Sequence, residues 1–454
     1  MIRQGFSPIQ SPFKRTPDLF GAVQGGVSMQ PSGSLLATAT AALNGIAPYH
    51  YWDFTTNRAL FAQKDVGAVT STPNWSFSRA STGYAQTLAG TLVSFGINEP
   101  RFTNKGFLIE DARTNVLLQS QTLATAPWSP FQSSITANAT AAPDGTTTAD
   151  KLVEDTTAAS THFHQQIVTL TASVHTFSIY AKAAERTQVS IFVPTTAFAD
   201  VAFRTASFDL TSAGSIFGLA GAGATASIEA LAGGWYRCIL NVPATLAVAA
   251  NIQYGMLVAN NPVYTGNGTS GLFLWGAQVE ASTVHSSYIT TTTVTVTRPA
   301  DSGSLSSPGV DYPLSAYTQF NRTMATLPTN TASINIDNNF ATERFTLLIN
   351  NTTSLLQPIV TAAGGAVQYN PNVLPALNAN VTTKIATRVS TASVNTARDN
   401  VLETASGAIT VPLTPVRIMF GVNPSFTAQL NGYLLRAAVF NTALVDATLQ
   451  RVTA

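Results

Sequence analysis

The sequence predicts an all-β protein, and two patterns predict it. Short segments alternate in side-chain chemistry with period two and are rich in β-branched and aromatic residues, as at 177–182 and 293–297. Clusters of turn-forming residues separate such segments at short intervals, for example at 143–145, 232–234 and 265–268. Many short strands with regular turns are typical of antiparallel sandwiches and jelly rolls, so we expect architectures of this kind.

The composition excludes several other classes of protein. Only 10% of the 454 residues are charged and 45% are hydrophobic, whereas average domains carry roughly 25% charged residues. This profile opposes both intrinsic disorder and a coiled coil. The 23 basic and 22 acidic residues leave a net charge of +1, so electrostatic binding of nucleic acid is not expected. At roughly 150 residues per domain, the length indicates about three domains.

Residues 1–45 are expected to form an extended arm. They show no sustained hydrophobic period and are interrupted by several prolines and glycines. A floppy terminus is one interpretation. The other is an arm that docks on another subunit, because apolar side chains recur along it; these candidate anchoring residues are Phe6, Ile9, Phe13, Leu19 and Phe20.

Two short segments favour helix over strand. The Ala-rich stretch 34–43 predicts one or two helical turns. Residues 443–451 place Leu444, Ala447 and Leu449 at the spacing of one helical face.

Neither a membrane span nor a secretory signal is expected. No stretch provides about 20 continuous apolar residues. The first residues lack the apolar core of a signal peptide. The single cysteine, Cys238, excludes a disulfide framework and is expected to be a small buried hydrophobic residue.

Three blocks of sequence contain distinctive motifs. The first contains FSRAST at 77–82, EPRF at 99–102 and GFLIEDARTNVL at 106–117, and it resembles a small β module of virion proteins of tailed bacteriophages. The second contains APW at 126–128, GGWYRC at 233–238 and GTSGLFLWGAQVE at 268–280. It resembles the carbohydrate-binding-module-like jelly roll of phage tail fibres and head fibres.

The third block, LNGYLLRAAVF at 430–440 followed by 444–449, resembles the last strand and closing helix of a concanavalin-like or laminin-G-like sandwich. The resemblance therefore implies four parts. They are an extended virion-anchoring arm at 1–45, a small β module at 46–117, the jelly roll at 118–298 and the C-terminal sandwich at 299–454.

The resemblance implies a structural, non-enzymatic virion protein, such as a tail fibre or receptor-binding appendage that contacts host-surface glycans. Its partners would be other virion proteins of the tail, the portal-proximal region or the capsid, and bacterial surface polysaccharide. Fibres of this type are usually homotrimers, located on the phage particle surface and made in the host cytoplasm without a signal peptide. One alternative is a capsid head fibre or decoration protein. A second is a capsule polysaccharide depolymerase, which usually has a repetitive β-helix; the sequence shows no such repeat.

Alternation along two strands suggests a glycan-binding patch. Along 177–182 it places Tyr180 and Lys182 opposite a core face, and along 272–280 it places Gln278 opposite the face that Phe273, Trp275, Ala277 and Val279 would share. If both strands line an open sheet, Tyr180, Lys182 and Gln278 combine an aromatic ring with hydrogen-bonding groups, as sugars require. Trp128, in a loop leading into a strand, is a further candidate; we expect the other four tryptophans to be core residues.

The remaining motifs favour structural interpretations. Asp144 and Asp150, near Glu154 and Asp155, are candidates for the structural calcium site of some jelly-roll modules, although turn chemistry with solvated charges also explains them. No other cofactor and no catalytic residue is expected. His162 and His164 share one side of a strand, which we expect to be an exposed polar face and not a metal site. The GNGTSG run at 266–271 precedes a strand and not a helix, which favours a hairpin turn over a nucleotide site.

Overall fold

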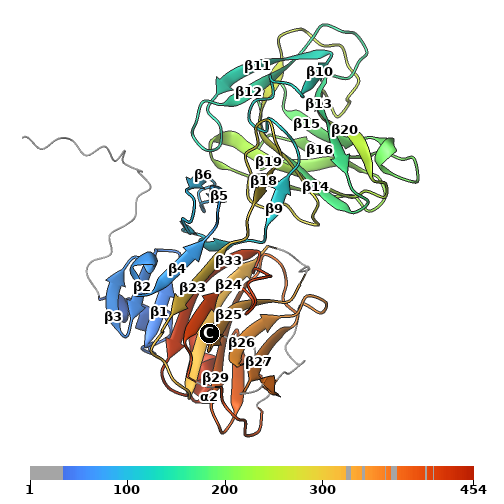
Figure 1. Ribbon diagram of the computed structural model, residues 1–454. Helices are drawn as coiled ribbons and strands as arrows, with labels where there is room; N and C mark the ends of the chain where they lie inside the picture. Colours follow the sequence, from blue (N-terminus) through green and yellow to red (C-terminus); the bar gives the residue numbers. More distant parts are fainter. Residues whose placement is uncertain are drawn as a thin grey trace, which may run out of the picture. The chain divides into compact units, whose positions relative to one another are not determined.

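Figure 1 shows the computed structural model of the chain. The structure describes residues 34–323, 329–339, 343–362, 365–369, 376–403, 406–412 and 414–454. The proposed anchoring residues lie outside the described residues; they are Phe6, Ile9, Phe13, Leu19 and Phe20.

The predicted all-β class is confirmed: the described residues form antiparallel sheets and two helices of eight residues each. One sandwich consists of two six-stranded sheets. The β13 sheet has the order β10 (Ser129–Phe131), β13 (Phe163–Leu170), β20 (Val248–Leu257), β15 (Gln188–Val193), β16 (Arg204–Asp209) and β17 (Ser215–Ala220). The β14 sheet has the order β11 (Ser133–Thr140), β12 (Ala149–Glu154), β21 (Gly271–Glu280), β14 (Val174–Lys182), β19 (Trp235–Pro243) and β18 (Thr225–Ala230). From β12 to β15 successive strands alternate between the sheets, as in a jelly roll.

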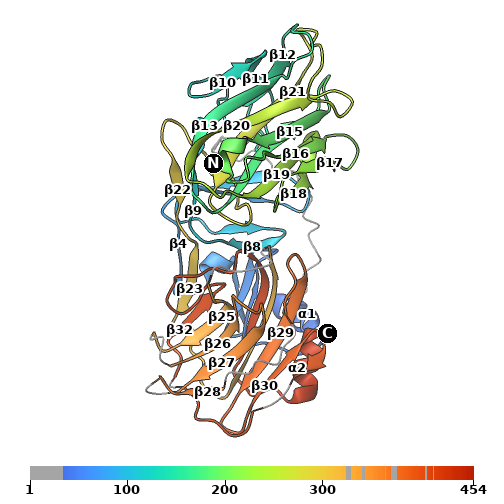
Figure 2. The ribbon, with the colours of Figure 1, turned by 90° about the vertical axis from the view of Figure 1, so that its right-hand side faces the viewer.

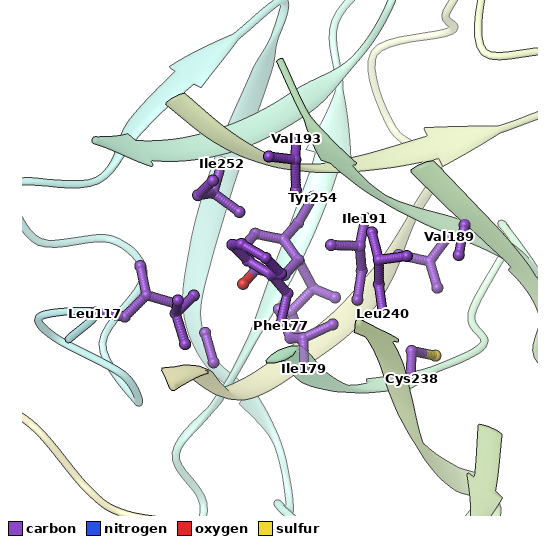
Figure 3. Close-up of a cluster of buried hydrophobic side chains, with 14 of the residues drawn as sticks. Leu117, Phe177, Ile179, Val189, Ile191, Val193, Cys238, Leu240, Ile252 and Tyr254 are labelled. Carbon is purple, nitrogen blue, oxygen red and sulfur yellow. The ribbon is translucent and has the colours of Figure 1, made fainter. Parts of the chain in front are cut away.

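Apolar side chains from the two sheets meet between them and form the jelly-roll core (Figure 3). Phe177 and Ile179 of β14 point into this core, as their alternation predicts, and Ile191 and Tyr254 approach from the β13 sheet. Cys238 is also fully buried here, as expected, and burial raises the pKa of its thiol. Removal of this apolar surface from water is the main force that joins the sheets.

A second sandwich combines the beginning and the end of the described chain. Its ten-stranded sheet contains β3 (Lys64–Gly67), β2 (Arg58–Phe61), β1 (His50–Asp53), β33 (Gly432–Phe440), β24 (Leu314–Arg322), β29 (Thr382–Val389), β30 (Val394–Arg398) and β31 (Val401–Leu402), with β8 (Gly106–Ile109) paired to β33 and β7 (Arg101–Thr103) to β8. Its seven-stranded sheet has the order β28 (Val367–Tyr369), β27 (Leu356–Thr361), β26 (Arg344–Ile349), β25 (Thr331–Asp337), β32 (Arg417–Phe420), β23 (Ser302–Ser306) and β4 (Trp75–Ser78).

The strands of 46–117 therefore do not form a sheet of their own. β1 pairs with β33, and β4 pairs with β23, so both belong to sheets that the C-terminal segment completes. Three strands of this segment lie outside the two large sheets. β5 (Gly83–Gln86) and β6 (Leu92–Phe95) form a hairpin with each other, and β9 (Arg113–Asn115) pairs with β22 (Val296–Arg298). The jelly roll is thus inserted between β9 and β22. Of the strand expected at 293–297, only its end lies in β22.

Both predicted helices are present and cover one face of the ten-stranded sheet. α1 (Leu35–Ala42) begins after Ser34, whose Oγ accepts a hydrogen bond from the Ala37 N–H at 3.3 Å. α2 (Asp446–Thr453) begins later than expected because Val445 is extended. Figure 2 shows both helices beside this sheet, where they bury Leu35, Leu449 and neighbouring apolar groups. Among the described residues there are also the 3₁₀ turns η1 (Val69–Ser71), η2 (Thr195–Ala197) and η3 (Ala232–Gly234).

No helix among the described residues is long and apolar enough to cross a membrane.

A buried group of five charged side chains, the ion network, lies where the chain enters and leaves the jelly roll. It consists of Arg79, Arg101, Arg298, Glu110 and Asp301. Arg101 donates to Glu110 at 2.6 Å and also to Asp301, and Arg79 donates to Asp301 at 3.2 Å. Although burial acts to raise the pKa of Glu110, the charges of Arg298 and Arg101 outweigh it and hold that pKa well below its ordinary value.

Replacing Glu110 should strongly destabilise the protein. Glu110→Gln leaves Arg101 and Arg298 without one of their counter-charges, and such a loss costs about 3–5 kcal/mol. Because the pKa of Glu110 is lowered by folding, its ionised form stabilises the fold above the ordinary carboxyl pKa of 4.5, and this stabilisation is lost as the pH falls. Urea unfolding at pH 7 and pH 4 should therefore show a large loss for the variant at pH 7 and a smaller one at pH 4.

The matched control is Arg58→Met, which removes an exposed ion pair with Asp65. It should change the free energy of unfolding by about 1 kcal/mol or less. Equal stability of Glu110→Gln and the control at pH 7 would show that the ion network does not hold the fold.

Candidate functional site

The glycan-binding patch predicted on β14 and β21 is not an open surface. Tyr180 is 2% exposed and Gln278 is 1% exposed, while Lys182 is half-buried. This face of the β14 sheet is covered by a cluster of buried side chains, the aromatic cluster: Tyr180, Trp235, Trp275, Tyr288, Leu92, Ala142 and Ala149. The expectation of an open sheet at this position is therefore wrong.

A β-bulge explains why strict alternation failed along β21. Ser178 pairs with Gln278 but Tyr180 pairs with Trp275, so β21 contains one extra residue at this point. Gly276 lies in the bulge with φ +62°. As a result Ala277 and Val279 face the jelly-roll core, whereas Trp275 lies in the aromatic cluster with Tyr180.

The segment that follows β21 covers this face, and two of the predicted site residues, Gln278 and Tyr180, contact it. The Gln278 Oε1 accepts a hydrogen bond from the Ile289 N–H at 2.7 Å. Tyr288 packs against Trp275 with ring centroids 4.6 Å apart. The Arg237 guanidinium lies 5.3 Å from the centre of the Tyr180 ring, and burial raises the pKa of Tyr180 to about 12. Tyr180 and Gln278 thus have structural contacts, although Tyr180 also lines a pocket described below.

Trp128 is also held inside the jelly roll. Its ring stacks on His164 with centroids 5.3 Å apart, and its Nε1–H lies 3.1 Å from the carbonyl oxygens of Leu118 and Gln119. His162 and His164 are both buried, so the exposed polar face expected for them is wrong. The residue between them, Phe163, faces outward instead.

The carboxylates of the two calcium candidates accept hydrogen bonds from other groups of the protein. Asp144 accepts from the N–H and the Oγ1–H of Thr146, at 3.0 and 2.6 Å. Asp150 is buried and accepts from the N–H groups of Leu123 and Asn138; burial raises its pKa, although these hydrogen bonds oppose the rise. No group of three or more His, Cys, Asp or Glu side chains suited to a metal ion occurs within the described ranges. The calcium interpretation gains no support.

Gly266 and Gly271 lie so close to neighbouring backbone that there is no room for a side chain. A strand follows them, as expected, but β20 and β21 belong to different sheets, so the segment is a crossover loop and not a hairpin turn. A Cβ on Gly266 or Gly271 would lie 2.0 Å from the carbonyl oxygens of Asp155 and Leu152, respectively.

The outward face of the β13 sheet, here called the open face, has the character that was predicted for the β14 sheet. Along β13, partly or fully exposed residues alternate with buried ones. Phe163 lies on this face and stacks on Phe131 of the neighbouring strand, with centroids 4.7 Å apart and an angle of 10° between the rings. Phe131 is 41% exposed, so an aromatic pair is presented to solvent.

Small and amide side chains continue across the open face from this pair. Strand pairing aligns Phe163 with Gly255, Ser190 and Ser207 in one row. The next row aligns the half-exposed amides Gln165 and Gln253 with Phe192, which stacks on Phe203 with centroids 5.3 Å apart. One aromatic pair thus lies in each row, and the partly exposed Ser190, Gln165 and Gln253 lie in the same two rows, whereas Gly255 and Ser207 are buried.

The open face is also uncharged at its centre, because β13, β20 and β15 contain no Asp, Glu, Lys or Arg. Surfaces that combine exposed rings with neutral hydrogen-bonding groups suit ligands with apolar patches and hydroxyls. The clue in the sequence is the alternation along 163–170, which places Phe163, Gln165 and Ile167 on the side of the strand opposite His164.

Comparisons with known proteins find structural similarity only. No protein-family model matches the chain, and no curated protein sequence matches it. Among solved structures, the CBM40 of the Ruminococcus gnavus IT-sialidase is 15% identical with a TM-score of 0.27, covering 31% of this chain and 82% of that one. Domain 4 of AbnA, a GH43 extracellular arabinanase from Geobacillus stearothermophilus in complex with arabinotriose, is 11% identical with a TM-score of 0.30, covering 34% and 73%. The NanB sialidase of Streptococcus pneumoniae is 13% identical with a TM-score of 0.27, covering 33% and 26%.

The bulge that directs Trp275 into the aromatic cluster should depend on glycine. In Gly276→Ala the new Cβ would lie 2.9 Å from the Tyr180 Cδ2, in a backbone conformation that side chains rarely adopt. Strain and overpacking together should cost about 2–4 kcal/mol in the free energy of unfolding, measured by urea denaturation.

Gly309→Ala is the control, because Gly309 has a similar φ of +65° but no atom within 4 Å of the added Cβ. It should cost only the backbone strain, about 1–2 kcal/mol. If both variants lost the same stability, packing against Tyr180 would not be the reason for the glycine.

Proposed function

We propose that the protein binds neutral glycan chains on the open face of the β13 sheet. The observation that carries this proposal is the stacked pair of the exposed Phe131 and the partly exposed Phe163, which lies beside the half-exposed amides of Gln165 and Gln253. Exposed aromatic groups on a sheet face are a feature of interaction surfaces.

The chemistry of the open face fits a glycan better than a charged partner. The C–H face of a sugar ring packs on an aromatic ring, and sugar hydroxyls exchange hydrogen bonds with amides. The central strands carry no ionised side chain. A neutral ligand that covers them therefore does not bury an unpaired charge, which would cost free energy. Two aromatic pairs linked by rows of small residues suit a chain of several sugar units.

We further propose that this binding serves a structural protein of a tailed bacteriophage, a tail fibre or receptor-binding appendage without enzymatic activity. The support is the resemblance of the blocks at 77–117, 126–280 and 430–449 to virion proteins. A homotrimer attached to other virion proteins follows from the same resemblance. A capsid head fibre is the alternative within the particle, and a polysaccharide depolymerase is the alternative outside this class.

Removing the exposed rings should weaken glycan binding without unfolding the protein. Because a ring contact is worth about 0.5–1.5 kcal/mol, Phe163→Ala should bind a responsive polysaccharide about threefold to tenfold more weakly, and the double variant with Phe131→Ala weaker still. A glycan array of bacterial surface polysaccharides followed by titration calorimetry measures this.

The control for this experiment is Val401→Ala, which removes an exposed apolar side chain of β31 in the other sandwich. It should bind as the wild type does. Unchanged binding by the double phenylalanine variant would exclude the open face, and release of reducing ends from the polysaccharide would favour the depolymerase alternative.

The anchoring role of the N-terminal arm can be tested by deleting residues 1–33. This deletion keeps α1, whose Leu35 and Ala39 pack on the ten-stranded sheet, so the melting temperature should match that of the full chain. The truncated protein should be absent from purified particles when analysed by mass spectrometry after complementation. Full incorporation of the truncated protein would show that the arm does not anchor it.

A further inference from the structure

A pocket with a volume of about 400 Å³ lies between the covered face of the β14 sheet, the β5–β6 hairpin and the nearby end of β33. It is separate from the open face and shares no residue with it. Its walls combine rings and ionisable groups, among them Tyr180, Tyr433, Lys105, Glu229 and His285. A volume of this size suits a small ligand, since ligand pockets measure about 300–1,000 Å³.

The polar groups of the pocket include two pairs of interacting side chains. The Glu229 Oε1 lies 3.1 Å from the His285 Nε2, and the side chain of Glu229 is 41% exposed. The Lys105 Nζ donates to the Gln86 Oε1 at 2.7 Å and lies 5.9 Å from the centre of the Tyr433 ring. A carboxylate acceptor and an ammonium donor are therefore both within reach of one ligand.

Glu229 stays ionised in this setting. Burial acts to raise its pKa, but His285, Arg237 and Lys105 outweigh burial and lower the pKa to about 2. At neutral pH the pocket therefore offers a permanent negative acceptor together with positive donors.

The arrangement of charges restricts the ligand. An anion would meet the carboxylate of Glu229, and a cation would meet Lys105 and the guanidinium of Arg237. Arg237 itself is fixed, because it donates to the Ser286 carbonyl oxygen at 2.8 Å and to the Ser178 Oγ at 3.0 Å. A ligand that carries neutral groups able both to donate and to accept avoids both repulsions.

We infer that this pocket binds a single neutral polyhydroxylated ring, of the size of a monosaccharide. Its hydroxyls would donate to Glu229 and accept from Lys105, and its apolar face would pack against Tyr433. The inference goes beyond the proposed function, because it assigns a second site and a different ligand size, one ring instead of a chain.

The pocket also connects to the ion network. Glu110 and Ser287 belong to its lining, and Ser287 donates to Glu110 at 2.6 Å. A ligand that binds only the folded state stabilises it in proportion to the logarithm of its concentration. Occupation of the pocket is therefore expected to raise the melting temperature.

The test is titration of the full chain with the methyl glycosides of glucose, galactose, mannose and N-acetylglucosamine, by calorimetry and thermal melting. We expect at least one of them to bind, while glucuronate and glucosamine bind more weakly. Glu229→Gln and, separately, Lys105→Met should each weaken binding about tenfold, because Glu229→Gln turns a charge-assisted hydrogen bond into a neutral one and Lys105→Met removes a hydrogen bond from a charged donor.

Two further variants separate the outcomes. Phe163→Ala on the open face should leave binding of the methyl glycoside unchanged, which distinguishes this site from the one proposed for glycan chains. Asn104→Ala, at the exposed rim, removes a side chain that accepts a hydrogen bond from the Leu88 N–H at 2.7 Å and forms part of the pocket wall, so it should weaken binding. Absence of binding by all four glycosides, or equal binding by wild type, Glu229→Gln, Lys105→Met and Asn104→Ala, would overturn the inference.

Discussion

The buried ion network is the constraint on which the arrangement of the chain depends. Arg101 and Asp301 are 200 residues apart in sequence, yet their charges meet beside Glu110, where the jelly roll is inserted into the second sandwich. Three arginines share two carboxylates there, so neither carboxylate can be lost without leaving a buried positive charge. The motifs at 77–82, 99–102 and 106–117 supply Arg79, Arg101 and Glu110, which explains why these segments carry charge in a chain that has so little of it.

The same scarcity of charge shapes the surface of the jelly roll. With no ionised side chain in β13, β20 and β15, the solubility of the open face depends on hydroxyl and amide groups. Binding a neutral ligand there removes no charge from water, and salt has little effect on such contacts. The ionisable groups that could bind a small ligand are gathered instead around Glu229, away from this face.

The period of the sequence predicted the fold class and the second helix, and alanine content predicted the first, because each depends on local sequence. It could not predict the candidate site, which depends on long-range packing. Because of the extra residue at Gly276, Phe273 and Trp275 lie on the opposite face of β21 from Val279. Tyr288, in the segment after β21, then packs over Tyr180. Likewise, the strands at 50–53 and 75–78 gave no sign that they would pair with β33 and β23, since pairing across hundreds of residues leaves no local signal.

The two faces of the jelly roll show why residue type alone is a weak guide to function. Tyr and Trp are residue types that bind sugars, but in this fold both rings pack inside the protein. Tyr180 lies in the aromatic cluster with Tyr288, and Trp128 stacks on His164. Phe163 is a less typical sugar-binding residue, yet it is partly exposed, stacked on the exposed Phe131 and flanked by amides. Because a ring can contact a ligand only where the chain leaves it uncovered, exposure decides between these candidates, and exposure is a property of the whole fold.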